Sequence, residues 1–147
     1  MKDSYFTRDN VQFNVDARDW QDAIKKSVSL LERNGYVDRH YVDAIIKSVE
    51  EFGPYIVISP GIAIPHTRPE NGALAVGVSL ITLKQPVYFK GVEAPVKVMI
   101  SFSATDNNQH LEIIKVIVNI VENGLIDRIS MINSIDDLNN LIGEDKG

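Results

Sequence analysis

Apolar residues recur along the chain with two spacings, one typical of strands and one typical of helices. Residues 10–15 (NVQFNV) alternate between polar and apolar positions, which predicts a short strand. An amphipathic helix is expected next, capped by Asp16 and ended by Gly35, and a second helix begins at Asp38 and ends at Gly53. The residues predicted to face inward are Trp20, Ile24, Val28 and Leu31 in the first helix, and Ile45, Ile46, Val49 and Phe52 in the second.

Three further apolar runs have the composition of strands. Residues 55–59 (YIVIS) predict a short buried strand, which Pro60 and Gly61 interrupt. The β-branched runs 74–83 and 96–102 predict two longer strands.

Two more helices are expected towards the C-terminal end. The first begins at a cap on Asp106 or Asn107 and runs to about Asn123, and the second begins where Ser134 and Asp137 resemble a capping box. The predicted buried face of the first of these helices consists of Leu111, Ile114, Ile117, Val118 and Val121. We therefore expect a single α/β domain, residues 1–147, with a central mixed β-sheet flanked by helices on both faces. The pattern leaves the order and the direction of the strands open.

Composition and charge exclude several classes of function. The 147 residues suffice for one domain with a sizeable core. The absence of cysteine excludes disulfides, thiol catalysis and thiolate metal ligands. A formal net charge of −5, without a Lys/Arg cluster, argues against nucleic-acid binding and suits a basic protein partner. Because the sequence shows no apolar run that could span a bilayer and no signal peptide, we expect a cytoplasmic protein without direct membrane insertion.

Histidine is the side chain best suited to proton or phosphoryl chemistry near neutral pH, and the chain has three. His66 lies in GIAIPHTRPENG, where Pro65 stiffens the backbone immediately before the imidazole. Such a loop would hold the imidazole at the edge of a sheet, beside the hydroxyl of Thr67 and the guanidinium of Arg68. The alternative is an exposed loop histidine without a role.

His110 falls in the first turn of the third predicted helix, in SATDNNQHLEII. The unpaired N–H groups and the positive dipole end of that turn favour an anion, and a second imidazole there could donate a hydrogen bond to a phosphoryl oxygen. The alternative is a solvated first-turn residue. His40, in DRHYVD, has no neighbours that suggest a site and is expected at the surface.

Other chemistries lack their sequence motifs. Zinc needs three or four ligands, and neither H-x-x-x-H nor HExxH spacing is present. The G-x-S-x-G motif of hydrolases, the P-loop and the GxGxxG motif are also absent from the sequence. We therefore expect neither a metal nor a cofactor.

The segment GIAIPHTRPENGA resembles the EIIA family of the mannitol–fructose class of sugar phosphotransferase systems. The resemblance covers most of the chain, from YVDAIIKSVEEFGPYIVISPGIAIPH through VGVSLITLKQPVYF and SFSATDNNQHLEIIKVIVNIV to SIDDLNNLI. Its most specific feature is an I-P-H after a strand, followed about forty residues later by D-x-x-x-H-L opening a helix. Within the class, FGPYIVISPGIAIPHTRPENGA looks most like the ascorbate-type branch.

The resemblance implies a role for each candidate residue. His66 matches the phosphorylated histidine, with phosphorylation on the tele nitrogen Nε2, and His110 matches a second active-site histidine that supports the phosphoryl group. An arginine that the mannitol and fructose branches often carry upstream is absent, because the aligned residues 47–48 are Lys-Ser. Arg68 is a candidate to supply this charge, and Thr67 is a second candidate for binding the phosphoryl group.

The resemblance also implies partners. An EIIA accepts a phosphoryl group from HPr and donates it to the cysteine of an EIIB, which serves the membrane permease EIIC. The sugar is not readable from an EIIA sequence, because selectivity lies in the membrane component. Two alternatives stay open at this point: a regulatory module whose phosphorylation controls a transcription regulator or another partner, and a binding protein for a small anion.

Overall fold

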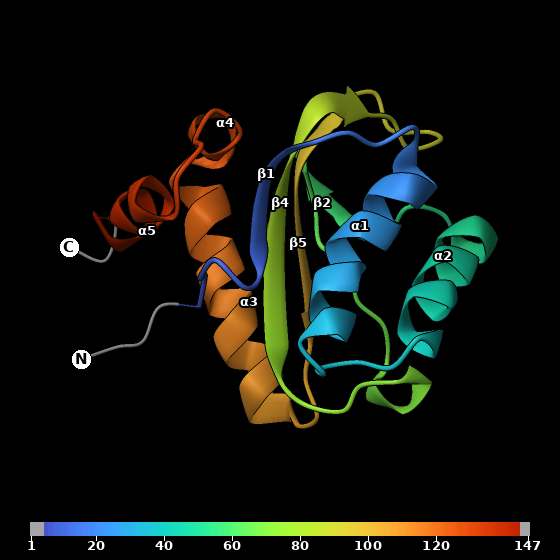
Figure 1. Cartoon of the computed structure of the whole chain (residues 1–147). Helices are drawn as coiled ribbons and strands as arrows, with labels where there is room; N and C mark the ends of the chain where they lie inside the picture. Colours follow the sequence, from blue (N-terminus) through green and yellow to red (C-terminus); the bar gives the residue numbers. More distant parts are fainter. Residues whose placement is uncertain (1–4, 145–147) are drawn as a thin grey trace.

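A five-stranded sheet lies between two layers of helices in the computed structural model, which describes residues 5–144 (Figure 1). The strands are β1 (Val11–Val15), β2 (Val57–Ser59), β3 (Ile62–Ala63), β4 (Gly77–Val87) and β5 (Val96–Ser103). The helices are α1 (Trp20–Arg33), α2 (His40–Phe52), α3 (Asn107–Glu122), α4 (Ile126–Ile129) and α5 (Ile135–Glu144), with one 3-10 turn, η1 (Pro69–Asn71).

The sheet is mixed, with the strand order β1-β4-β5-β3-β2. Parallel pairs (β1 with β4, β3 with β5) alternate with antiparallel pairs (β4 with β5, β2 with β3). In the parallel pair of β3 and β5, Ala63 lies opposite Met99. The loop that follows β3 and the helix that follows β5 therefore begin at the same end of the sheet, where these two strands end.

Each face of the sheet has its own core. Successive residues of β4 point to opposite faces, so that Leu80 and Ile81 belong to different clusters. Leu80 packs in the cluster that includes Ile117 of α3 and Leu138 of α5, whereas Ile81 packs in the cluster that includes Ile45 of α2. This arrangement confirms a single α/β domain with helices on both faces. Among the helices within residues 5–144, none has the length and apolar character needed to cross a membrane.

The first helix begins later than the sequence predicts. Asp19, not Asp16, caps α1, because its carboxylate accepts a hydrogen bond from the N–H of Asp22 at 2.9 Å. Asp16 lies too early to cap a helix that begins at Trp20. Its short polar side chain gave the same signal as that of Asp19, and only the start of the helix distinguishes them.

The two later caps are confirmed. The carboxylate of Asp106 accepts from the N–H of Gln109 at the start of α3, at 2.8 Å. The hydroxyl of Ser134 accepts from the N–H of Asp137 at the start of α5, at 3.1 Å.

The buried face of α3 differs from the prediction. α3 buries Ile113, Ile117 and Ile120, and of these only Ile117 was expected. Leu111 is 55% exposed and Val118 is 42% exposed. Because α3 has apolar residues around much of its circumference, the sequence permits several apolar stripes, and packing on the sheet selects one of them.

Other differences concern the ends of elements. Phe52, predicted to face inward, is the last residue of α2 and is 75% exposed. Leu74 is 61% exposed and precedes β4, which begins at Gly77 and continues past Leu83 to Val87. The short helix α4 was not predicted.

Candidate active site around His66

The loop that carries His66 is tied to two other segments at the edge where β3 and β5 end. The N–H of Ile64 donates to the carbonyl of Ile56 at 2.8 Å, and the N–H of Phe102 donates to the carbonyl of Pro65 at 3.2 Å. The ring of Pro65 fixes its own φ immediately before the histidine. The main chain that presents the imidazole is therefore held from both sides.

The far end of the loop closes against the start of α2. Gly72 has a φ of +132°, which strains L residues, and a Cβ atom there would collide with the carboxylate of Asp38. The N–H of Asp38 donates to the carbonyl of Gly72 at 2.9 Å. Within the loop, the side-chain amide of Asn71 donates to Oγ1 of Thr67 at 2.9 Å, so this segment is compact.

A hydrogen bond sets the protonation of the His66 ring. Nδ1 lies 2.6 Å from the carbonyl oxygen of Ile64. A carbonyl oxygen can only accept, so Nδ1 carries the hydrogen, and the neutral ring has its free lone pair on Nε2. Nε2 is therefore the nitrogen available as a nucleophile.

Aromatic side chains enclose the His66 ring. Phe102 stacks on it with centroids 4.7 Å apart and planes at 16°, and Tyr55 contacts it edge-on at 5.8 Å and 74°. The Tyr55 hydroxyl also donates to the carbonyl of His66 at 2.7 Å. Burial lowers the pKa of His66 below its ordinary value of 6.5, and the nearby His110 acts in the same direction, although the hydrogen bond to Ile64 opposes both. The ring is therefore neutral, and so nucleophilic, at pH 7.

His110 lies beside His66, in the first turn of α3. The two ring centroids are 6.4 Å apart, with the planes at 63°. Phe102 contacts both rings, since its centroid is also 5.5 Å from that of His110. The structure thus brings together two histidines that are far apart in the sequence.

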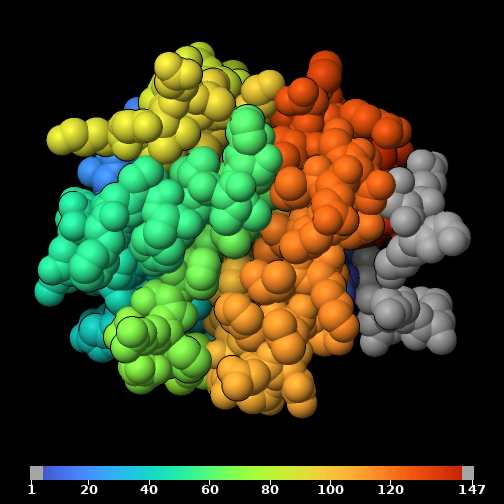
Figure 2. Space-filling model, turned by 180° about the vertical axis from the view of Figure 1, so that it is seen from behind, coloured from blue at the N-terminus to red at the C-terminus, as the bar shows by residue number. Residues whose placement is uncertain are grey.

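The two imidazoles line a cleft of about 500 Å³. The cleft is lined by Ser48, Phe52, Tyr55, His66, Thr67, Arg68, Pro69 and His110, a set that contains all four predicted site residues. Figure 2 shows α2 (turquoise) and α3 (orange) on either side of the green segment that follows β3. Arg68 is the one arginine or lysine in the lining, and its guanidinium forms no ion pair within residues 5–144.

Three aromatic residues of the site were not predicted to belong to it. Tyr55 and Phe102 lie in runs predicted as strands, where aromatic residues ordinarily indicate core packing. Tyr41 lies in α2, and its hydroxyl donates to the carbonyl of Phe102 at 2.8 Å. The one available signal was its spacing of four residues before the buried Ile45, because a tyrosine on a buried helix face needs a partner for its hydroxyl.

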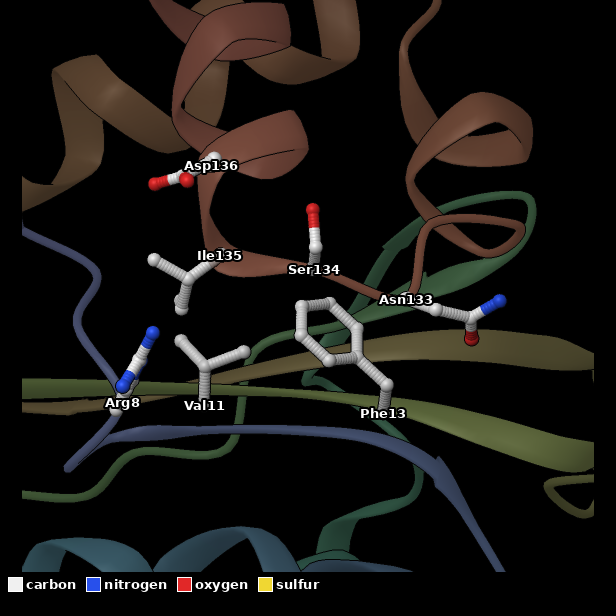
Figure 3. Close-up of a pocket in the computed structure, with 7 residues that line it drawn as sticks. All are labelled: Arg8, Val11, Phe13, Asn133, Ser134, Ile135 and Asp136. Carbon is white, nitrogen blue, oxygen red and sulfur yellow. The ribbon is translucent and has the colours of Figure 1, made fainter.

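A second cavity, of about 400 Å³, lies between β1 and the start of α5 (Figure 3). Its lining residues are Arg8, Val11, Phe13, Asn133, Ser134, Ile135 and Asp136. Its lining includes no histidine, and the hydroxyl of Ser134 already caps α5.

The side chain of His40 is 71% exposed, as expected. Within residues 5–144, no group of three or more His, Cys, Asp or Glu side chains is placed to hold a metal ion.

The sequence matches the family described as "Phosphoenolpyruvate-dependent sugar phosphotransferase system, EIIA 2" over residues 4–145. The chain belongs to this family. The EIIA resemblance is therefore confirmed, and this EIIA protein is a phosphoryl-transfer component of a sugar phosphotransferase system.

Two relatives are similar to this EIIA over most of its length. The ascorbate-specific PTS system EIIA component of Salmonella typhimurium (strain LT2) is 42% identical over 124 residues, which cover 83% of this chain and 80% of the relative. The mannitol-specific cryptic phosphotransferase enzyme IIA component of Escherichia coli (strain K12) is 45% identical over 108 residues, which cover 73% of each chain.

Solved structures have the same fold. The solution structure of the mannitol-specific cryptic phosphotransferase enzyme IIA CmtB from Escherichia coli matches with a TM-score of 0.84 at 35% identity, over 97% of each chain. A complex of enzyme IIA-mannitol and phosphorylated enzyme IIB-mannitol from Escherichia coli contains a chain that matches with a TM-score of 0.81. That match has 22% identity and covers 95% of this chain and 97% of the other, which shows the common fold.

Proposed function

We propose that this protein carries a phosphoryl group on Nε2 of His66, which it accepts from HPr and passes to the cysteine of an EIIB. The observation that carries the proposal is the 2.6 Å hydrogen bond from Nδ1 of His66 to the carbonyl of Ile64. It leaves the lone pair on Nε2, in a ring that lines the cleft. Family membership supplies the class of reaction, and the hydrogen bond indicates the reacting atom.

Phosphoryl transfer between proteins needs a neutral nucleophile, an in-line approach and donors for the equatorial oxygens. Nε2 of His66 attacks the phosphorus of the donor phosphohistidine, while the donor P–N bond breaks and its electron pair stays on the donor imidazole. The lowered pKa of His66 keeps the attacking nitrogen unprotonated at neutral pH. In the second transfer, the thiolate of EIIB attacks the same phosphorus and the electron pair returns to Nε2.

Three neighbours of His66 are proposed to bind the phosphoryl oxygens. His110 contributes a ring N–H from the first turn of α3, where the helix dipole also favours an anion. The oxygen of the Thr67 hydroxyl accepts from Asn71, so its hydrogen is left to donate to a phosphoryl oxygen. Arg68 lies on the exposed rim of the cleft and contributes a permanent positive charge.

The ascorbate type is the proposed branch. Ser48, one of the two residues aligned with the upstream arginine of the mannitol and fructose branches, lines the cleft and brings a hydroxyl rather than a cation. The ascorbate-specific relative is also similar over a longer stretch than the mannitol-specific cryptic relative, 124 residues against 108. The sugar itself never contacts an EIIA, so the branch concerns the EIIB and EIIC partners.

Exposed apolar residues at the cleft suit transient docking of HPr and EIIB. Phe52 and Tyr55 line the cleft and are 75% and 42% exposed, and Leu111, next to His110, is 55% exposed. The Escherichia coli enzyme IIA-mannitol, which has the same fold, is known in complex with phosphorylated enzyme IIB-mannitol, and this supports an EIIB as acceptor here. We place this function in the cytoplasm, with the whole chain, residues 1–147, acting as one EIIA domain that serves an EIIC permease indirectly.

Intact-mass spectrometry tests the proposal after incubation with phosphoenolpyruvate, enzyme I and HPr. We expect the wild type and the control variant His40→Ala to gain one phosphoryl group, and His66→Ala to gain none. A gain in His66→Ala would refute the assignment of His66. A wild type that binds phosphate but gains no covalent group would favour the anion-binding alternative.

A second step separates the carrier from a regulatory module. The phosphorylated protein is presented to purified EIIB domains of the ascorbate, galactitol, mannitol and fructose types. Fast transfer to the ascorbate type is expected. Fast transfer to the mannitol or fructose type alone would show that the branch is wrong, and transfer to none of them would favour the regulatory module.

A further inference from the structure

Tyr41 lies under the His66 loop and has no part in the chemistry described so far. Its side chain is 1% exposed, on the face of α2 that packs against the sheet. The hydroxyl lies 2.8 Å from the carbonyl oxygen of Phe102, and 3.3 Å from both the N–H nitrogen and the carbonyl oxygen of Thr67. Burial raises the pKa of Tyr41 to about 12, so the hydroxyl keeps its proton.

These distances define donor and acceptor. The single phenolic hydrogen goes to the nearest acceptor, the carbonyl of Phe102, and the phenolic oxygen then accepts the N–H of Thr67. The ring of Phe102 stacks on His66, and Thr67 directly follows His66 in the loop. One buried hydroxyl therefore connects the aromatic platform under the imidazole with the main chain that carries it.

We infer that Tyr41 is a positioning residue for phosphoryl transfer, an inference that rests on the proposed function of His66. Its hydroxyl keeps the main chain of Thr67 at a fixed distance from that of Phe102. The imidazole can then keep both its stack on Phe102 and its hydrogen bond to Ile64. A misplacement of the reacting group by about 1 Å can cost about 100-fold in rate.

The burial of Tyr41 distinguishes a positioning role from a role in docking the partner proteins. Because the side chain of Tyr41 is enclosed, it touches neither HPr nor EIIB. Its loss should therefore slow the transfer step and leave partner affinity unchanged. Tyr55 also donates to the loop, but it lines the exposed cleft, where an effect on affinity would be mixed with an effect on position.

The test is Tyr41→Phe, which removes the hydroxyl and keeps the ring. At saturating phospho-HPr, we expect the rate of His66 phosphorylation to fall about 5- to 30-fold, as the loss of 1–2 kcal/mol at the transition state would give. The phospho-HPr concentration that gives half the maximal rate of His66 phosphorylation should be the same as for the wild type. ¹⁵N NMR of the His66 ring should show a smaller population of the Nδ1–H tautomer, a signature that a loss of stability alone would not produce.

Tyr88→Phe is the matched control. Tyr88 is 64% exposed and follows β4 at the end of the sheet where β5 begins, whereas Phe102 lies near the last residue of β5. This variant should have the rate and the tautomer of the wild type.

A 4-aminophenylalanine at position 41 gives a second measurement. It keeps a donor for the Phe102 carbonyl but accepts poorly from the Thr67 N–H, so its rate should lie between those of the wild type and Tyr41→Phe. If Tyr41→Phe does not fold, a rate below that of the wild type is still expected for the amino variant. If Tyr41→Phe folds and has the rate and the tautomer of the wild type, the inference is overturned. If Tyr41→Phe does not fold, the same result in the amino variant overturns it. A wild type that takes no phosphoryl group on His66 would instead refute the proposed function.

Discussion

His66 donates from Nδ1 to the carbonyl oxygen of Ile64, two residues earlier in the same loop, at 2.6 Å. Because both partners belong to the segment that leaves β3, the local main chain sets the tautomer. The stack on Phe102, with the planes at 16°, fixes the orientation of the ring. The nucleophilic nitrogen is therefore selected before a phosphoryl donor arrives.

The phosphorylated protein should carry its phosphoryl group on Nε2 of His66. Nδ1 is occupied by its hydrogen bond to Ile64, so only Nε2 has a free lone pair. ³¹P and ¹⁵N NMR of the adduct distinguish the two isomers, and the adduct should be labile in acid and stable in alkali, as a P–N bond is. An Nδ1 adduct would contradict the prediction, since it requires the bond to Ile64 to break first.

Phosphoryl acceptance should persist to a lower pH than an ordinary histidine allows. Burial, and secondarily the proximity of His110, lowers the pKa of His66 below 6.5. The midpoint at which the acceptance rate declines with falling pH should therefore lie below 6.5, the midpoint expected of an ordinary histidine. An NMR titration of the His66 ring gives the pKa directly, and a midpoint at or above 6.5 would contradict the prediction.

The same pKa shift predicts a pH dependence of stability. The unfolded chain takes up a proton on residue 66 near pH 6.5, whereas the folded chain does so only at lower pH. The contribution of His66 to the free energy of unfolding is therefore complete above pH 6.5 and is lost as the pH falls from 6.5 towards the folded-state pKa. Urea unfolding at several pH values should show this loss in the wild type and not in His66→Gln. Parallel pH profiles for the two proteins would argue against a lowered pKa.

His110→Ala should still accept a phosphoryl group on His66, but more slowly. Loss of one hydrogen-bond donor costs about 2.7–4 kcal/mol in a well-studied oxyanion site. A smaller effect is expected here, because the cleft is open to water, which can replace part of the lost interaction. His110→Gln keeps a side-chain donor and should recover part of the rate. Rapid-quench kinetics measure the three proteins, and equal rates would remove His110 from the site.

The cap of α3 should affect both stability and transfer. Asp106 accepts from the N–H of Gln109, and the helix that it caps carries His110 in its first turn. Asp106→Ala should therefore reduce the free energy of unfolding by about 0.5–2 kcal/mol and slow transfer, whereas Asp106→Asn, which can also cap, should change both much less. Denaturant unfolding and transfer rates on the same samples provide the comparison. Wild-type stability in Asp106→Ala would show that the cap does not support the helix.

Much of the fold could be predicted because periodicity and capping are local properties. Asp106 and Ser134 cap helices where the pattern placed them. The choice between equivalent local signals could not be predicted. Asp16 and Asp19 have the same capping side chain, and the stripe on α3 depends on how the helix rests on the sheet, a contact between distant segments.

The candidate site shows the same division. His66 and Arg68 are near neighbours in one loop, so their proximity could be read from the sequence. His110 was a candidate from its position in the first turn of a predicted helix, and the resemblance gave it a role in the site. Its place beside His66 follows from the parallel pairing of β3 with β5. The spacing of Tyr41 before Ile45 indicates a buried helix face but not a place in the site, and Phe102 reads as a core residue of a strand. Their roles arise from contacts between distant segments, which no periodicity encodes.

Arg68→Ala should slow phosphoryl transfer and leave stability nearly unchanged. Arg68 is exposed at the rim of the cleft, and within the described residues its guanidinium has no carboxylate partner, so its removal breaks no ion pair of the fold. The free energy of unfolding should therefore change by no more than about 0.5 kcal/mol. The transferring phosphoryl group, in contrast, would lose the one arginine or lysine charge in the cleft lining.

Arg128→Ala is the matched control, since Arg128 is also exposed and lies in α4, which follows the end of α3 opposite His110. Both variants lose one positive charge, so a general effect of net charge on association with HPr would appear in both. An effect confined to the site would appear only in Arg68→Ala, and Arg68→Lys, which keeps the charge but loses the planar fork of donors, should recover part of the rate. Transfer rates for these variants are measured at low and at high salt, because screening weakens long-range attraction more than a direct contact with the phosphoryl group. Equal rates for Arg68→Ala and the wild type at both salt concentrations would show that Arg68 does not replace the absent upstream arginine.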